Sequence, residues 1–141
     1  MGFFKRKKNP DCKKCGFFKT ATSPYIPPVG DGGKGILIIG TQPNFDDDQY
    51  GKYGHSDEYS TMQSLLKTAG IDIEEDCYFM TTVSCYGDDE LDKKHIDACR
   101  PNVYEFIKHN DIKLIIPMGK DAVASLYRER VDDINGSPSI S

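Results

Sequence analysis

The sequence lacks any apolar run of about 18 residues, the length that a membrane-spanning helix requires. It also lacks an apolar signal segment at the N-terminus, and its five cysteines are an odd number. Both features disfavour a secreted, disulfide-bonded protein, so we expect a cytoplasmic protein with reduced thiols and no membrane partner. The sequence contains no internal repeat and no low-complexity segment. Its 141 residues suffice for one domain with a real core, but not for two.

Charge is distributed unevenly, although the formal net charge is only −4. Residues 1–20 contain seven basic side chains and one acid, whereas the remaining 121 residues contain eleven bases and twenty-one acids. A basic arm with interleaved phenylalanines suits the backbone of a nucleic acid. The candidate DNA-binding side chains are Lys5, Arg6, Lys7, Lys8, Lys13 and Lys14. From composition alone, a solvated tail is the alternative.

Four of the cysteines form two pairs that lie far apart in sequence, and they are the candidate metal ligands: Cys12, Cys15, Cys85 and Cys99. Two residues of spacing let the first pair turn both thiolates toward one ion, and the second pair then comes from the folded domain. A zinc site and a [4Fe-4S] cluster both fit four thiolates. Cys77 stands among apolar residues and is expected to be a buried, unreactive thiol.

The chain divides into a basic arm with a Pro/Gly-rich connector (1–34) and an α/β domain (35–141). Short apolar runs predict a strand buried on both faces at 35–40 and a further buried strand at 113–116, and an aromatic and β-branched run predicts a strand at 77–83. Helical spacing predicts helices at 57–69, 90–99, from Pro101 onward, and at 121–127, whereas residues 46–53 read as an acidic loop. This alternation predicts a three-layer, doubly wound, mostly parallel sheet. From Asp132 onward no periodicity is left, so the last strand of such a sheet is expected to be missing.

The expected helix faces can be stated more closely. Met62, Leu65, Leu66 and Ala69 repeat at helical spacing, with Ser56 as N-cap, and should point inward. Ala122, Val123 and Leu126 should do the same in the last predicted helix. Pro101 is expected to end one helix and start the next. The three histidines are expected at the surface: His55, His95 and His109.

Taken in order, these motifs resemble the uracil-DNA glycosylase superfamily, specifically its family 4 iron–sulfur branch. The matching stretches run from residue 12 to about residue 127: Cys12-Lys-Lys-Cys15, Gly40-Thr-Gln-Pro-Asn44, Asp47-Asp-Gln-Tyr-Gly51, Tyr78-Phe-Met-Thr-Thr-Val-Ser-Cys85, Cys99-Arg-Pro101 and Leu114-Ile-Ile-Pro-Met-Gly119. The resemblance implies base-excision DNA repair, a [4Fe-4S] cluster on the four cysteines, and DNA that is single-stranded or contains uracil. It is also compatible with a bacteriophage origin, and hence with a bacterial or phage-infected cytoplasm.

The loop after the first strand is the candidate site for a flipped base, because glycine and proline keep that backbone close and stiff. The candidate substrate-binding residues are Gly40, Thr41, Gln42, Pro43, Asn44, Tyr53 and Thr81. Gln42 and Asp48 are the catalytic candidates. Gln42 can hold a water, and Asp48 matches the aspartate of the family's Glu-Asp pair.

Several positions depart from the family pattern. Thr41 stands where the family has an acidic residue, and Thr81 stands where it has the asparagine that reads the uracil edge. Tyr53 is the nearest candidate for the aromatic residue that stacks on the base, one position off. The family's His-Pro-Ser-type loop lies beyond residue 141. We therefore expect weak or no activity from this chain alone, unless a C-terminal fragment completes it.

Two other functions remain open from the sequence. The chain could be a catalytically silent DNA-binding domain that accompanies a phage-type replication protein or DNA polymerase. It could also be a zinc-stapled domain that contacts protein partners.

Overall fold

A three-stranded parallel sheet, in the order β2-β1-β3, forms the centre of the fold. The computed structural model describes residues 16–87, 91 and 93–127. The strands are β1 (Ile36–Gly40), β2 (Cys77–Thr81) and β3 (Leu114–Pro117); the helices are α2 (Phe17–Thr20), α3 (Phe45–Tyr50), α4 (Asp57–Thr68), α5 (Lys93–His109) and α6 (Lys120–Tyr127). The predicted α/β class and its parallel sheet are confirmed. The predicted division at residues 34 and 35 stays a prediction.

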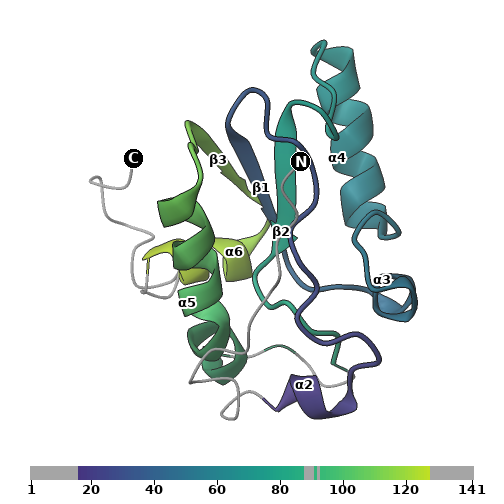
Figure 1. Ribbon diagram of the computed structural model, residues 1–141, viewed down its shortest axis with the longest axis vertical. Coiled ribbons are helices and arrows are strands. Elements are labelled where there is room, and N and C mark those ends of the chain that lie inside the picture. Colours follow the sequence, from purple (N-terminus) through teal and green to yellow (C-terminus); the bar gives the residue numbers. More distant parts are fainter. Residues whose placement is uncertain (1–15, 88–90, 92, 128–141) are drawn as a thin grey trace.

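Helices cover both faces of the sheet (Figure 1). Successive residues of a strand point to opposite faces, and β2 shows where each face leads. The Tyr78 ring meets Phe106 of α5 edge-on at 5.0 Å, whereas the Phe79 ring meets Tyr59 of α4 edge-on at 5.0 Å. α4 and α5 therefore lie on opposite faces, and α6 packs beside α5. This is the predicted three-layer arrangement.

β1 is the central strand, and its sequence explains why. All five of its residues are buried, as an unbroken apolar run requires when both faces are covered. Ile38 pairs with Phe79 on one side and with Ile116 on the other. β3 was expected to be equally buried, but this expectation was wrong. β3 forms an edge of the described sheet, and Leu114 is 53% exposed.

The Pro/Gly-rich connector runs beside β2, on the side away from β1. Val29 and Phe79 exchange two backbone hydrogen bonds, of 3.0 and 2.8 Å. The N–H of Ile26 donates to the carbonyl of Ser84, and the Ile26 side chain is 1% exposed. The connector thus runs antiparallel to β2, from the carboxyl end of the sheet at Ile26 toward its amino end, where β1 begins.

α4 begins as its sequence predicts, because the Ser56 hydroxyl accepts a hydrogen bond from the N–H of Tyr59. Its buried face is narrower than predicted. Tyr59 and Leu66 are buried, but Leu65 is 58% exposed and Ala69 is exposed too. Adjacent helical residues differ by about 100° in direction, so burial of Leu66 turns Leu65 toward solvent.

Residues 45–50 form helix α3, although the acidic stretch was predicted to be a loop. Asn44 caps the helix: its side-chain oxygen accepts from the N–H of Asp47 at 2.8 Å. Asp47 reciprocates by accepting from the N–H of Asn44 at 3.1 Å. This capping box offsets the weak helix propensity of three aspartates, which also lie favourably in the first turn.

α5 is one continuous helix through Pro101, so the predicted break at this residue was wrong. Proline removes a single N–H donor, and here it stands on the exposed side of the helix. Buried residues on both sides of it, Ile96 and Cys99 before and Val103 and Phe106 after, hold the two halves against the domain. Packing therefore outweighs the local penalty of the proline.

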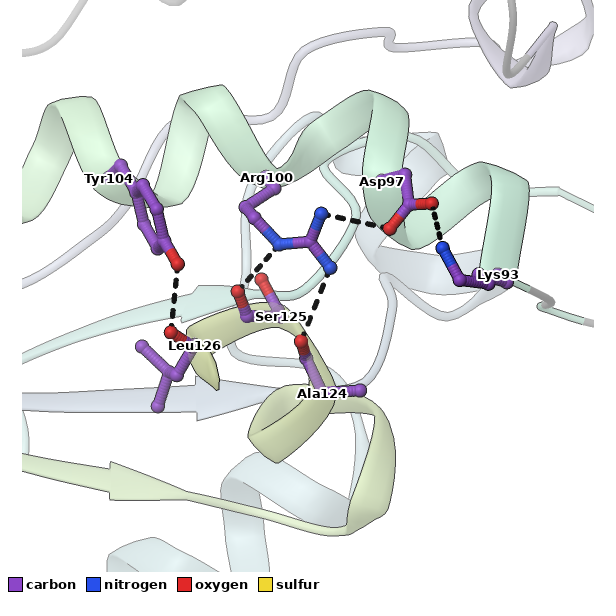
Figure 2. Close-up of polar contacts among 7 residues, drawn as sticks. All are labelled: Lys93, Asp97, Arg100, Tyr104, Ala124, Ser125 and Leu126. Carbon is purple, nitrogen blue, oxygen red and sulfur yellow. Dashed lines mark hydrogen bonds and ion pairs between the residues drawn. The ribbon is translucent and has the colours of Figure 1, made fainter. Parts of the chain in front are cut away.

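The C-terminal end of α6 is capped by side chains of α5, as Figure 2 shows. The Arg100 guanidinium donates through Nε to the carbonyl of Ser125 at 2.8 Å and through Nη2 to that of Ala124 at 3.2 Å. The Tyr104 hydroxyl donates to the carbonyl of Leu126 at 2.8 Å. These are carbonyls that a helix end cannot satisfy internally. A cation there also complements the helix dipole.

Asp97 holds Arg100 in this position from its other side, at 2.8 Å. Burial alone would raise the pKa of Asp97, but hydrogen bonds from Lys93 and Arg100 and their charges hold that pKa below its usual range.

We expect Arg100→Met to lower the free energy of unfolding by about 1.5–3 kcal/mol, because two carbonyls lose a charged donor. Urea unfolding measures this. Lys108→Met, an exposed change on the same helix, is the control; equal stability of the two variants would contradict the capping role.

No helix of the described residues combines the length and the apolar character needed to cross a membrane.

Candidate active site and cysteine cluster

The carboxyl end of β1 lies where the chain direction switches between the two faces of the sheet. After β1 the chain enters α3 and α4 on one face, and after β3 it enters α6 on the other. Ligands of open α/β sheets bind in the crevice at such a switch point. The loop Gly40–Asn44 therefore occupies the expected position for a binding site.

A carboxylate from α4 lies directly against this loop. One oxygen of Glu58 accepts from the N–H of Thr41 at 2.9 Å, and the other accepts from the Thr41 hydroxyl at 3.0 Å. Gly40 makes room for it, since a Cβ atom at that position would collide with Glu58 Oε1. Thr41 stands on this turn where the family has an acidic residue, and Glu58 was not among the site residues predicted from the sequence. The structure supplies the missing charge from α4.

Within the loop, one candidate side chain has an unused acceptor. The side-chain oxygen of Gln42 is buried and accepts no hydrogen bond from the described residues. Such an oxygen normally has a partner, which can be a water or a ligand. Pro43 is fully buried, and Asn44 is engaged in capping α3 and in a bond from its Nδ2 to the carbonyl of His55 at 3.1 Å. Gln42 is thus the loop residue best placed to receive a donor.

Tyr53 and Thr81 are brought together, but inside the core. Tyr53 is 2% exposed and meets Phe79 edge-on at 5.4 Å. Its hydroxyl lies 2.6 Å from the Thr81 hydroxyl, which in turn donates to the carbonyl of Val83 at 2.5 Å. In this arrangement both hydroxyls are engaged with each other and with the backbone.

The catalytic candidate Asp48 and its neighbour Asp47 are both buried, and their carboxylates accept hydrogen bonds from backbone N–H groups. The Asp48 carboxylate accepts from the N–H of Thr22 at 3.1 Å and from that of Ser23 at 2.8 Å. Asp47 accepts from the N–H of His55 at 3.0 Å, in addition to its capping role. Asp48 therefore ties the connector to α3, which is a contact that sequence alone did not indicate.

The two cysteines of the second predicted pair meet in one cluster. Cys85 and Cys99 are buried together with Phe17 and Val83, and neither forms a disulfide. Phe17 is only two residues after Cys15 in the chain. Cys12 and Cys15 lie outside the described residues, as do the six basic candidates between Lys5 and Lys14. In residues 16–87, 91 and 93–127 no group of three or more metal-ligating side chains converges.

Hydrogen-bond donors point at both sulfurs. The N–H of Tyr25 donates to Cys85 Sγ at 3.2 Å, while Cys99 Sγ accepts from the N–H of Ser84 at 3.4 Å and from Asn102 Nδ2 at 3.2 Å. Tyr25 has a φ of 61°, which is rare for a residue with a side chain. Neither Tyr25 nor Asn102 was singled out from the sequence.

One histidine departs from its predicted place. His55 and His109 are exposed, as expected, but His95 is 3% exposed and stacks on Phe17 with ring centroids 4.1 Å apart. Gly87 permits this contact, because a Cβ there would collide with the Phe17 ring. His95 thus helps to fix the chain next to Cys85 and Cys99, and the prediction of a surface residue was wrong.

Cys77 is fully buried in β2, as predicted. Burial, with smaller contributions from Asp76 and Asp72, raises its pKa to about 11. At pH 8 only about one thiol in a thousand would be ionised, and the thiolate is the reactive form.

We expect iodoacetamide to leave Cys77 unmodified in the folded protein and to modify it once urea unfolds the chain, as peptide mass spectrometry would show. Rapid modification of the folded protein at pH 8 would contradict this.

Comparison with known proteins agrees with the fold. A search of curated proteins found no significant match. A comparison with protein-family models matches residues 27–138 to the uracil DNA glycosylase superfamily. That range contains all three strands and the loop that faces Glu58. Membership implies DNA as the partner and glycosylase-type chemistry as the class of function. The chain belongs to the uracil DNA glycosylase superfamily.

Proposed function

We propose that this chain is a uracil-DNA glycosylase-like protein of the family 4 iron–sulfur type, which binds DNA and a flipped base at the Gly40–Asn44 loop. The observation that carries this proposal is the placement of that loop, in a chain of this superfamily, at the switch point of the sheet. Base-releasing enzymes must receive the extruded base in a pocket and read its hydrogen-bonding edge. The basic arm would contact the DNA backbone.

The loop has features suited to that role. Its backbone is held by Glu58 at Thr41, and the buried oxygen of Gln42 is available to accept a hydrogen bond from a base or a water. A glutamine can orient water but cannot take its proton. Glu58 is the nearest carboxylate that hydrogen-bonds this loop, so we propose that it replaces the acidic residue missing from position 41. Asp48 remains a proposed catalytic residue, although its carboxylate also accepts hydrogen bonds from the backbone of Thr22 and Ser23.

The cysteines present fit a metal centre. Cys85 and Cys99 are buried in one cluster and accept N–H donors, as thiolate ligands do. Two residues of chain span about 7 Å at most, so the arm that precedes Phe17 can bring Cys15 and Cys12 to the same place. The resemblance favours a [4Fe-4S] cluster, with zinc as the alternative. The metal centre would link the N-terminal arm to the segment that follows β2 and to α5.

Catalysis by this chain alone is proposed to be weak. Thr81 is engaged with Tyr53 and Val83, and the bond from Asn44 of the loop to His55 goes to the backbone carbonyl of that histidine, not to its ring. Among the described residues β3 forms an edge of the sheet and Leu114 is 53% exposed, so a strand of a complementing fragment could pair there. The alternative proposal is a catalytically silent DNA-binding domain of a phage-type replication system, for which the same loop substitutions argue.

Release of uracil tests the proposal. The protein would be incubated with single-stranded DNA that contains one uracil, and abasic sites would be detected by alkaline cleavage. We expect slow cleavage at uracil and none in the matching thymine strand. Gln42→Leu should abolish it, whereas Gln49→Leu, an exposed change on α3, should not.

Two other outcomes separate the alternatives. Absence of release together with salt-sensitive DNA binding that ignores uracil would favour the silent accessory domain. A colourless, zinc-containing protein that does not bind DNA would contradict both, and would favour a protein-interaction domain.

A further inference from the structure

The side chain of Asn102 lies one helical turn after Cys99 on α5 and donates from Nδ2 to Cys99 Sγ at 3.2 Å. Asn102 is only 7% exposed, so its amide is held inside the protein beside the sulfur. The backbone N–H of Ser84, in the segment that follows β2, points at the same sulfur at 3.4 Å. Donors from two separate elements therefore converge on one thiol group.

This arrangement suits a negatively charged sulfur. A neutral thiol is a weak acceptor, whereas a thiolate or metal-bound thiolate accepts N–H donors well. Burying an amide without hydrogen-bond partners costs free energy, so the contact between Asn102 and the sulfur contributes to the stability of this arrangement. The sulfur of Cys85 also accepts a backbone hydrogen bond. The N–H of Tyr25 donates to it at 3.2 Å, and Tyr25 has a backbone conformation that is rare for a residue with a side chain.

We propose that Asn102 is a positioning residue for the metal centre, which stabilises the Cys99 thiolate and thereby sets how tightly the metal is held and how readily the centre is reduced. This inference rests on the metal site proposed above and adds to it a residue outside the four cysteines. Hydrogen bonds to ligand sulfurs are among the features that set cluster potentials. Partners of this kind also commonly change metal affinity by 10- to 100-fold when they are removed.

The direction of each effect follows from charge. A donor to the sulfur stabilises the more negative, reduced form of a cluster, so its removal makes reduction less favourable. We expect Asn102→Leu to lower the equilibrium constant for one-electron reduction about tenfold, which is a shift of about −59 mV. We also expect a chelator to remove the metal about tenfold faster, and this second measurement applies equally to iron and to zinc.

The experiment compares metal-loaded wild type, Asn102→Leu and Asn102→Asp with Asn110→Leu. Asn110 donates from Nδ2 to the carbonyl of Phe106 at 2.8 Å, so its variant loses an amide contact next to the same helix without touching a sulfur. Chelator-driven release would be followed by absorbance, and reduction by titration with a chemical reductant. Asn102→Asp keeps the size of the side chain, and serves if the leucine variant does not fold.

The outcomes are distinguishable. Faster release from both Asn102 variants, with Asn110→Leu like wild type, supports the inference. Release and potential unchanged in the Asn102 variants would overturn it and leave the metal site intact. Equal acceleration in Asn110→Leu would also overturn it, because the effect would then be general destabilisation. A wild-type protein that binds no metal through Cys85 and Cys99 would overturn both the metal site and this inference.

Discussion

Replacing Cys99 by alanine is expected to lower the free energy of unfolding by at least about 3 kcal/mol and to abolish metal binding. The change leaves the N–H of Ser84 and the amide of Asn102 without their acceptor in a buried place. It also removes one of the ligands proposed to join the arm to α5. Urea unfolding measures the first effect, and metal analysis of the purified variant measures the second.

Cys77→Ala is the matched control for this experiment. Cys77 is buried, as Cys99 is, but it lies in β2 within the main core and belongs to neither cysteine pair. Its loss should create only a small cavity, at a cost of about 1 kcal/mol, and should leave the metal content unchanged. If the two variants were equally stable and retained equal metal, Cys99 would be an ordinary buried thiol.

Replacing Asp48 by alanine is the second change with a large expected effect. Its carboxylate, 3% exposed, accepts from the backbone of Thr22 and Ser23, so removal leaves two donors unpaired where the connector meets α3. We expect a loss of about 2–4 kcal/mol, measured by urea unfolding. Because the connector follows the cysteine-bearing arm, we also expect faster release of the metal to a chelator.

Asp46→Ala, an exposed change on the same helix, should alter neither quantity. The comparison also separates two roles for Asp48. An Asp48→Ala variant with wild-type stability and metal retention, but without uracil release, would make Asp48 a catalytic group and not an anchor.

Much of the fold could be predicted from the sequence, because its strongest signals are local. The apolar run at 35–40 predicted a strand covered on both faces, which β1 is, and Ser56 predicted the start of α4. The errors have physical causes. Residues 46–50 were predicted to be part of a loop, but the capping box of Asn44 and Asp47 stabilises a helix there. A helix break was predicted at Pro101, but buried residues on both sides of it keep α5 continuous.

The site was predicted less completely, since its contacts join residues distant in sequence. The position of the Gly40–Asn44 loop followed from strand order, and the structure buries Cys85 and Cys99 in one cluster. Nothing local indicates that Glu58 reaches back to Thr41 or that His95 stacks on Phe17. Such contacts depend on how α4 and α5 pack against the rest of the domain.

The most direct test of this account is the metal and sulfide content of the protein purified without oxygen, together with its visible spectrum. We predict about four iron atoms per chain and an absorbance band at about 400 nm. Both should disappear in Cys85→Ala and Cys99→Ala and persist in Cys77→Ala. A wild-type protein without metal, or a metal content that the Cys85 and Cys99 variants leave unchanged, would contradict it.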